Sequence, residues 1–240
     1  MSGLGRVVAF NWPRYAAGLA TVALGAALPR PRALRCPVRA GVALTFTWIL
    51  TSLAATWWTY DRSPMYQWLW LADLLPAPPA RYAVVSAGLD EVSPTLRRLF
   101  PTAQPILLDV YDTRLTRSGS IRRARALVLP PAGARPARPA ALPVPDSALD
   151  AVFVVFAAHE LRTADGRRAL FTEIARILRP GGRLLLVEHC RDTANITAYG
   201  PGAWHFYPRK EWQQLCQDAG LTPAGEKTMT PLVRALAYRR

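Results

Sequence analysis

Three histidines and two glutamates carry most of this chain's capacity for proton chemistry. His159 and Glu160 follow one apolar run, Glu188 and His189 end another, and His205 lies further along in an aromatic segment. A histidine titrates near neutrality, so each could accept a proton from a hydroxyl or thiol group. We therefore take His159, His189 and His205 as candidate catalytic residues. Glu188 is a fourth candidate that could orient a histidine or contact substrate, although ordinary hydrogen-bonding roles remain open for all four.

Two buried strands and a helix must position these residues. Leu149 to Phe156 is a nearly continuous apolar run, which is typical of a strand covered on both faces. Arg167 to Leu178 has the period of an amphipathic helix and ends before Pro180-Gly181-Gly182, and Arg183 to Glu188 forms the next apolar run. This βαβ pattern predicts an open α/β sheet, in which ligands bind beyond the carboxyl ends of the strands.

The segment before this unit has the same alternation. Tyr82 to Ala87 is an apolar run that ends at Gly88, Glu91 to Phe100 is predicted to be a helix, and Ile106 to Val110 is the next strand, with Asp109 near its end. A glycine at the first turn lets the backbone approach a ligand, and an acid at the tip of the second strand can hold ribose hydroxyls.

The segments LPVPDSALD and LRPGGRLLLVEH resemble the second half of the class I S-adenosylmethionine-dependent methyltransferases. In that family an "LPFPD…FD" segment leads into the fourth strand, and an "LKPGGRLL" turn leads into the fifth. The resemblance runs from Tyr82 to the C-terminus and implies a Rossmann-like sheet with S-adenosylmethionine as the cofactor. The positions that it implies for cofactor binding are Ser86, Gly88, Asp90, Asp109, Phe156 and Ala157.

The first glycine loop departs from the family pattern. The family usually has acid-x-Gly-x-Gly-x-Gly, whereas this chain reads VVSAGLD from Val84 to Asp90, so that only Gly88 matches. This departure leaves two functions open. The chain is a methyltransferase for a small hydrophobic acceptor, or it is a catalytically degenerate, membrane-tethered binding or assembly protein.

The remaining elements of the sheet have weaker patterns. Ala126 to Leu129 is a short candidate for the third strand, and Pro130 to Pro145 is rich in proline, alanine and arginine, which predicts an irregular loop. Towards the C-terminus, Lys210 to Ala219 is a predicted helix and Thr230 to Tyr238 is the predicted terminal strand.

The N-terminal region has a different composition. Ala40 to Tyr60 contains no charged residue and is long enough to cross a bilayer, while Tyr15 to Leu28 is also uncharged but shorter. Most of the eight tryptophans lie before residue 75, several at the ends of these segments, as in an aromatic belt. We expect an N-terminal membrane helical hairpin, with a buried soluble helix as the alternative.

Residues after Tyr60 read as a short interfacial helix and a proline-rich linker that ends near Pro79. We therefore predict two parts: a membrane hairpin with its interfacial helix and linker over residues 1–79, and a methyltransferase-like domain over residues 80–240. The arginine-rich loop from Pro29 to Arg39 favours a cytoplasmic loop, which would place the domain outside. The cytosolic cofactor instead favours a domain in the cytoplasm. A shallow hairpin that does not fully cross the membrane would allow both the arginine-rich loop and the domain to lie on the cytoplasmic side. We expect the domain to face the cytoplasm, most naturally at a bacterial inner membrane.

The net charge and the number of cysteines limit which partners and ligands are expected. The net charge is +14, but the sequence has no nucleic-acid-binding motif. We therefore expect the basic residues to lie near anionic lipid headgroups rather than to bind nucleic acid. The three cysteines and three scattered histidines lack metal-ligand spacing, and no metal site is predicted. The expected partners are membrane lipid and a small quinone-like, isoprenoid or lipid substrate. The oligomeric state is left open.

Overall fold

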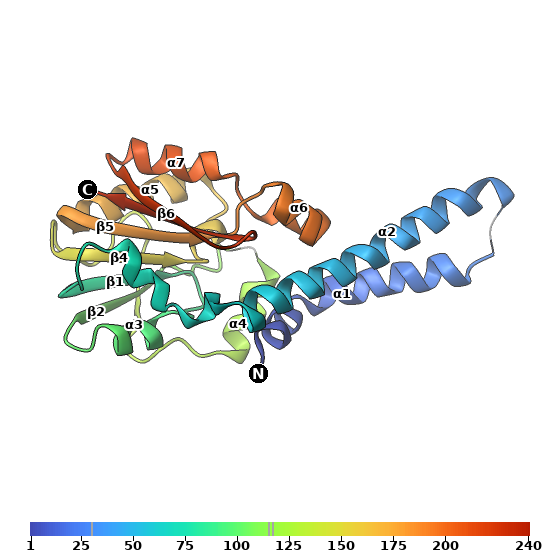
Figure 1. The fold of residues 1–240 in the computed structure, drawn as a ribbon, viewed down its shortest axis with the longest axis horizontal. Helices are drawn as coiled ribbons and strands as arrows, with labels where there is room; N and C mark the ends of the chain where they lie inside the picture. Colours follow the sequence, from blue (N-terminus) through green and yellow to red (C-terminus); the bar gives the residue numbers. More distant parts are fainter. Residues whose placement is uncertain (30, 115, 117) are drawn as a thin grey trace.

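The protein consists of an α/β body and a pair of long helices that project from it (Figure 1). The computed structural model describes residues 1–29, 31–114, 116 and 118–240. The α-helices are α1 (Gly3–Ala27), α2 (Arg32–Trp57), α3 (Ser93–Leu99), α4 (Gly119–Leu127), α5 (Ala164–Ile177), α6 (Thr193–Tyr199) and α7 (Arg209–Asp218). A π-helical turn, η1 (Trp58–Arg62), and the 3-10 turns η2 (Pro64–Gln67), η3 (Leu69–Leu74), η4 (Ala158–Glu160) and η5 (Gly200–His205) complete the helical segments.

A single mixed sheet forms the centre of the body, in the order β3-β2-β1-β4-β5-β7-β6. Its strands are β1 (Arg81–Ser86), β2 (Gln104–Asp109), β3 (Arg135–Pro136), β4 (Leu149–Val155), β5 (Leu178–Glu188), β6 (Thr222–Thr230) and β7 (Val233–Arg239). The first five strands pair in parallel, and β7 pairs antiparallel with both β5 and β6. The expectation of a Rossmann-like α/β sheet is thereby confirmed.

Helices cover both faces of the sheet. On one face, α5 and α7 bury Phe171 and Trp212 against the strands. On the other face, α3 contributes Leu96, and the turns η2 and η3 contribute Met65 and Leu71. All five side chains are fully buried. The apolar runs of β4 and β5 are therefore covered on both sides, which is why they lack the alternation of a half-exposed strand.

Two strand predictions were incomplete. The expected third strand at Ala126–Leu129 is wrong, because these residues end α4 and enter the following loop. Strand β3 instead lies inside the proline-rich segment and is only two residues long, so no run of apolar residues marks it. Strand β6 was not predicted, because most of its side chains are exposed and it has no apolar face.

The N-terminal segments form a helical hairpin, as expected, but its helices are longer than the uncharged segments. Helix α1 begins at Gly3, and α2 begins at Arg32, within the stretch that was predicted to be a connecting loop. Pro37 lies near the start of α2, where it removes one backbone hydrogen bond without ending the helix. At Gly25 the two helices approach so closely that a Cβ atom would lie 2.4 Å from Val42 Cγ2.

The segment between the hairpin and β1 packs its largest side chains against the sheet. Met65, Trp68 and Leu71 are fully inaccessible to solvent, and the predicted interfacial helix is replaced by the 3-10 turns η2 and η3. These large side chains fill the sheet face beside α3, where their burial stabilises the attachment of the segment to the sheet.

Polar contacts join the two ends of the hairpin to each other and attach the hairpin to the body. Asp61 of η1 accepts hydrogen bonds of 2.7 Å from the backbone amides of Gly3 and Leu4 at the start of α1. The Arg123 side chain of α4 donates to the Phe10 carbonyl at 2.6 Å. Thr51 of α2 donates to the Ala198 carbonyl of α6 at 3.3 Å. The half of the hairpin nearest the body is thus fixed beside α4 and α6, and the half that carries the tip projects away from the body.

Candidate active site

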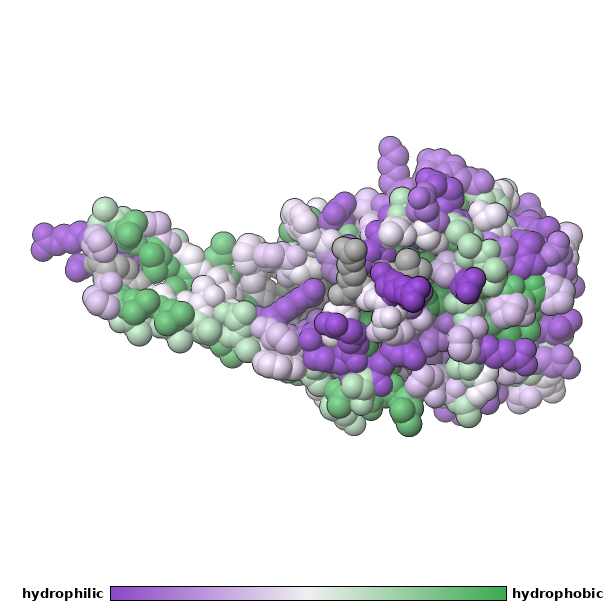
Figure 2. All heavy atoms as spheres, turned by 180° about the vertical axis from the view of Figure 1, so that it is seen from behind, coloured by the Kyte–Doolittle hydropathy of each residue, from purple (hydrophilic) through white to green (hydrophobic). Residues whose placement is uncertain are grey.

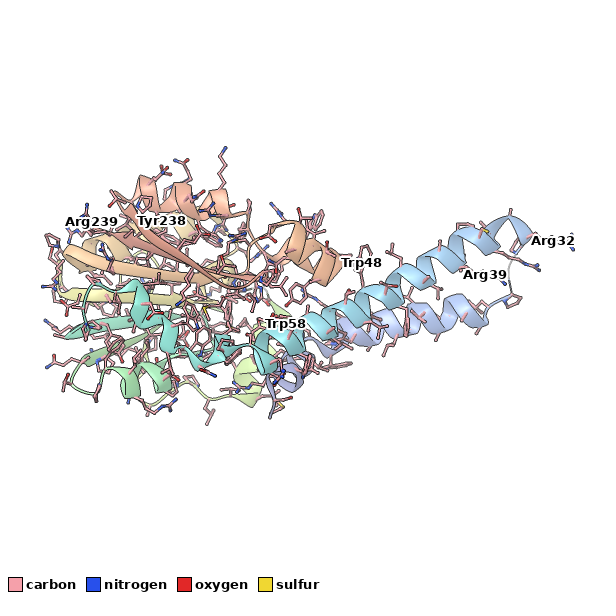
Figure 3. The ribbon with its side chains drawn as sticks, in the orientation of Figure 1. Arg32, Arg39, Trp48, Trp58, Tyr238 and Arg239 are labelled. Carbon is pink, nitrogen blue, oxygen red and sulfur yellow. The ribbon has the colours of Figure 1, made fainter. Side chains whose placement is uncertain are left out.

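A cavity of about 860 Å³ lies where the hairpin meets the carboxyl edge of the sheet. Its floor comes from the segments after β1, β4 and β5, and its walls come from α1, α2 and the α6–η5 segment. On the hairpin side, Phe10 and Tyr15 of α1 and Trp48 and Ile49 of α2 face it. Trp48 lies on the α6 side of the hairpin, nearer the base than the tip (Figure 3). The volume is within the range of small-molecule binding sites.

Two of the predicted histidines meet at one wall of this cavity. His159 Nδ1 lies 2.6 Å from Glu188 Oε2, and His159 Nε2 lies 3.4 Å from Glu160 Oε1. His205 Nε2 lies 3.2 Å from the same Glu160 oxygen. His159, Glu160 and His205 line the cavity, whereas Glu188 is buried behind His159. The structure thus brings three of the four predicted catalytic residues into one network through Glu160.

Burial and charge act in opposite directions on this network. Burial alone would lower the pKa of His159, but the adjacent Glu188 and Glu160 carboxylates raise it to about 10. Burial would likewise raise the pKa of Glu160, but hydrogen bonds from His159 and His205 lower it. The pKa of His205 is lowered, mainly by burial. At neutral pH the network therefore holds a positive charge on His159 between two carboxylates.

His189 lies apart from this network and has the opposite character. Phe156 and Phe206 stack on its ring, with centroid distances of 5.1 Å and 4.8 Å. Its Nδ1 lies 2.8 Å from the Leu232 carbonyl, and its Nε2 lies 2.6 Å from the Tyr60 hydroxyl. Burial lowers the pKa of His189 to about 4, so the ring is neutral. Nδ1 must then donate to the carbonyl, and Nε2 accepts from Tyr60.

The first loop adopts the backbone that a glycine requires. Gly88 has a φ of +99°, and its amide donates to Asp109 Oδ1 at 2.9 Å. Asp109 Oδ1 also accepts from the Tyr111 amide at 3.0 Å, and Oδ2 forms an ion pair with Arg125 of α4. A Cβ atom on Gly88 would lie 2.8 Å from Ile121 Cγ2. Side chains of α4 thus close the space above the glycine, and both oxygens of Asp109 already have partners.

The other predicted cofactor residues differ in position. Phe156 lines the cavity and has an unusual φ of +50°. Ser86 is buried and donates to the Leu108 carbonyl. Asp90 accepts hydrogen bonds from the Val92 and Ser93 amides, so its carboxylate orders the turn that leads into α3. Ala157 is buried beneath the cavity floor.

Sequence reasoning missed several residues of the cavity. Tyr60 ends the hairpin, and Glu91 follows the glycine loop, where it accepts a hydrogen bond from Tyr66 and lies 3.8 Å from Arg6. Burial raises the pKa of Glu91. Tyr60, Tyr66 and Arg6 belong to the N-terminal region, and no motif connects them with the sheet. Glu91 could have been found from the sequence, because it is an acidic residue three positions after Gly88.

Comparison with known proteins finds sequences and structures that are similar to part of this chain. Residues 85–186 match the family described as a methyltransferase domain. The ubiquinone/menaquinone biosynthesis C-methyltransferase UbiE of Pseudomonas putida is 30% identical over 126 residues, which cover 51% of this chain and 46% of that protein. The chain therefore spans about half the length of the curated relatives that it matches.

Solved structures share the fold at low identity. An O-methyltransferase family 2 protein from Planctomyces limnophilus, in complex with apigenin, aligns with a TM-score of 0.53 at 16% identity, covering 81% of this chain and 61% of that one. The geranyl diphosphate C-methyltransferase of Streptomyces coelicolor, with Mg²⁺, geranyl diphosphate and S-adenosyl-L-homocysteine, aligns with a TM-score of 0.51 at 16% identity. It covers 71% of this chain and 77% of that one. At this identity the similarity concerns the fold.

Proposed function

This chain contains a class I S-adenosylmethionine-dependent methyltransferase domain, and from that premise we propose that the protein methylates a small hydrophobic acceptor at a membrane surface. The observation that carries the proposal is the shared cavity. Its floor lies at the carboxyl edge of the sheet, where such folds bind ligands, and its walls include both helices of the hairpin. An acceptor dissolved in a bilayer could reach this cavity along the helices.

The residues present are compatible with S-adenosylmethionine, on one condition. The cavity reaches Leu89 and Glu91 after β1 and Phe156 after β4, and Asp109 stands at the tip of β2 beside Gly88. Asp109 would hold the ribose hydroxyls, which requires the ion pair between Arg125 and Asp109 Oδ2 to break. The cofactor, when bound, supplies an activated methyl group. The protein's own task is then mainly to position the acceptor.

The Tyr60–His189 pair is the proposed proton acceptor. His189 is neutral, and its Nε2 accepts the Tyr60 hydrogen bond, so a proton from an acceptor hydroxyl could pass through the Tyr60 hydroxyl to His189. The Nδ1 hydrogen bond to the Leu232 carbonyl fixes this tautomer. His159 is cationic between Glu160 and Glu188, and it would polarise an acceptor oxygen rather than take its proton.

The exposed apolar surface of the hairpin supports membrane insertion. Figure 2 shows apolar side chains along the projecting helices, and large ones are about half exposed: Leu19, Leu24, Leu34, Leu44, Phe46 and Leu50. The segment Arg32–Arg62 is long and apolar enough to cross a membrane. Helix α2 alone has 26 residues, about 39 Å of helix against a hydrocarbon core of about 30 Å. Arg32 and Arg39 lie toward the tip and Trp58 at the base (Figure 3), as polar and aromatic anchors would.

Calorimetry with S-adenosyl-L-homocysteine on the detergent-solubilised full chain tests the cofactor. We expect saturable binding that Asp109→Asn weakens and that Asp165→Asn, a change of an exposed acid on α5, leaves intact. Transfer of a labelled methyl group from S-adenosylmethionine to quinone-like or isoprenoid acceptors in vesicles tests the activity. Absence of cofactor binding would refute the proposed methyltransferase activity. Binding without transfer to any acceptor would instead favour the degenerate binding protein, for which the altered glycine loop is the supporting observation.

We also propose that the domain faces the cytoplasm of a bacterial cell. Protease added to spheroplasts should then leave the domain intact, and its digestion from outside would refute this orientation. Cys36 near the tip of α2 is exposed, whereas Cys190 and Cys216 are buried, so a membrane-impermeant maleimide reports on the tip alone. Labelling from outside would indicate a hairpin that crosses the membrane, and protection would indicate a shallow one. Cys36→Ser controls for labelling elsewhere.

A further inference from the structure

Two histidine nitrogens and one carboxylate oxygen converge at the cavity wall. Suitable ligand atoms of His159, Glu160 and His205 all lie within 4.8 Å of one another. The Glu160 oxygen is 3.4 Å from His159 Nε2 and 3.2 Å from His205 Nε2. Ligands held about 2.0–2.1 Å from a tetrahedral Zn²⁺ are about 3.3–3.4 Å from each other. We propose that these three side chains bind a divalent transition-metal ion of the zinc type.

Glu188 is placed to orient one of the ligands. Its Oε2 atom lies 2.6 Å from His159 Nδ1, which leaves Nε2 as the metal-binding atom. In the metal-free protein this nitrogen carries a proton, which the ion would displace on binding. A carboxylate that accepts the second ring N–H fixes the tautomer and raises the basicity of a metal-bound histidine. Glu188 is itself almost fully buried and rigidly held at the end of β5, so the His159 ring has one defined orientation.

A buried atom without a partner points to a missing ligand. Glu160 is about 2% exposed, and its Oε2 atom has no hydrogen-bond partner among the described residues. An unpaired buried carboxylate oxygen is costly, and a nearby cation would remove that cost. The carboxylate could bind the ion through either oxygen, because both belong to the same group at the centre of the cluster.

The two ligand-bearing segments are held together independently of any ion. Arg162 donates through one nitrogen to the His159 carbonyl at 3.0 Å and to the His205 carbonyl at 2.8 Å. Its guanidinium also lies over the Tyr207 ring, 4.8 Å from the centroid. Arg162 therefore fixes the distance between η4 and η5, and the ligands do not depend on metal for their approach.

Three protein ligands leave a fourth position open. His159, Glu160 and His205 all line the cavity, so the open position faces the cavity and would take a water or an oxygen atom of a substrate. Two imidazoles and a carboxylate suit Zn²⁺ and related ions better than Mg²⁺. The site departs from the expectation of no metal, because the ligands are distant in sequence. Metal binding itself does not depend on the proposed methyl transfer.

Cobalt binding tests the site with a readout that is separate from activity. The full chain is purified with an affinity tag that lacks histidine, stripped with a chelator and titrated with Co²⁺, whose visible absorption reports tetrahedral coordination. We expect one equivalent per chain, displaced by one equivalent of Zn²⁺. His205→Ala and Glu160→Gln should abolish the tetrahedral spectrum. Glu188→Gln should keep it and weaken the affinity about 10–100-fold, as a partner of a metal ligand does.

Matched controls separate this site from others. Asp165→Asn removes an exposed carboxylate on α5 and should leave cobalt binding unchanged, and Cys36→Ser excludes the exposed thiol. Far-ultraviolet circular dichroism establishes that each variant is folded. His205 is partly exposed, and its variant should therefore fold even if Glu160→Gln does not. The proposal is overturned if the wild type shows no tetrahedral cobalt, or if folded His205→Ala binds cobalt as the wild type does.

Discussion

The ion pair between Arg125 and Asp109 should oppose cofactor binding, and Arg125→Ala should therefore increase it. Asp109 Oδ1 accepts two backbone hydrogen bonds, which leaves Oδ2 for a ribose hydroxyl, but Arg125 holds that atom. The Arg125 guanidinium also lies 4.5 Å from the centroid of the Tyr111 ring, in the space beside Gly88. Cofactor binding at Asp109 must displace Arg125 from the Oδ2 atom. The free energy of this ion pair therefore reduces the affinity for the cofactor.

The size of the effect follows from the exposure of the pair. Arg125 is 29% exposed and Asp109 is 12% exposed, so the pair lies between a surface ion pair and a buried one. A charged hydrogen bond contributes about 1.5–3 kcal/mol, and fully exposed pairs contribute about 1 kcal/mol or less. We take about 1–2 kcal/mol for this pair, which corresponds to roughly 5–30-fold tighter binding in Arg125→Ala.

Calorimetric titration with S-adenosyl-L-homocysteine measures this change. Arg122→Ala is the matched control, because Arg122 is an exposed arginine on the same helix and its loss changes the net charge equally. The control should bind as the wild type does. Weaker binding by Arg125→Ala than by Arg122→Ala would refute the reasoning and would make Arg125 a cofactor ligand instead. Equal binding would show that Asp109 does not hold the ribose.

Three further predictions concern stability. Burial lowers the pKa of His189 to about 4 from an ordinary value of 6.5, so the unfolded chain binds the extra proton between these values. Stability should fall by about 3 kcal/mol as the pH decreases from 6.5 to 4, and thermal unfolding of His189→Gln should lack this slope. Tyr60→Phe leaves His189 Nε2 without its donor and should lower the free energy of unfolding by about 1–3 kcal/mol, whereas an unchanged melting temperature would contradict the hydrogen bond. Gly88→Ala forces a Cβ atom against Ile121 at a positive φ and should cost about 1–3 kcal/mol, measured by thermal shift; a neutral effect would mean that α4 moves freely.

The central part of the fold could be predicted because its signals are local. The apolar runs of β4 and β5, the amphipathic α5 and the Pro-Gly-Gly turn each identify themselves within a few residues. Strand β3 has no such signal, because two residues beside β2 cannot show a pattern. Strand β6 pairs only with β7 at the edge of the sheet, and its exposed polar side chains look like a loop.

The strand-end residues of the candidate site, together with His205, were predictable from the sequence. His159, Glu188 and His189 could be placed together because neighbouring parallel strands end at one edge of the sheet. The partners Tyr60 and Arg125 could not be found, since each reaches its contact from a helical segment whose docking depends on long-range packing. At the glycine loop the sequence shows the departure from the family motif, but it could not show that side chains of α4 lie against Gly88.

The cavity has one wall that belongs to the hairpin and a floor that belongs to the sheet, and this division has a kinetic consequence. If the hairpin lies in a bilayer, an acceptor enters by lateral diffusion, and the relevant concentration is its mole fraction among the lipids. Diluting the acceptor with inert lipid at constant bulk concentration should then slow the reaction, whereas adding water should not. A domain without residues 1–62 would keep the sheet edge that forms the floor of the cavity, but it would lack the hairpin wall that encloses the acceptor.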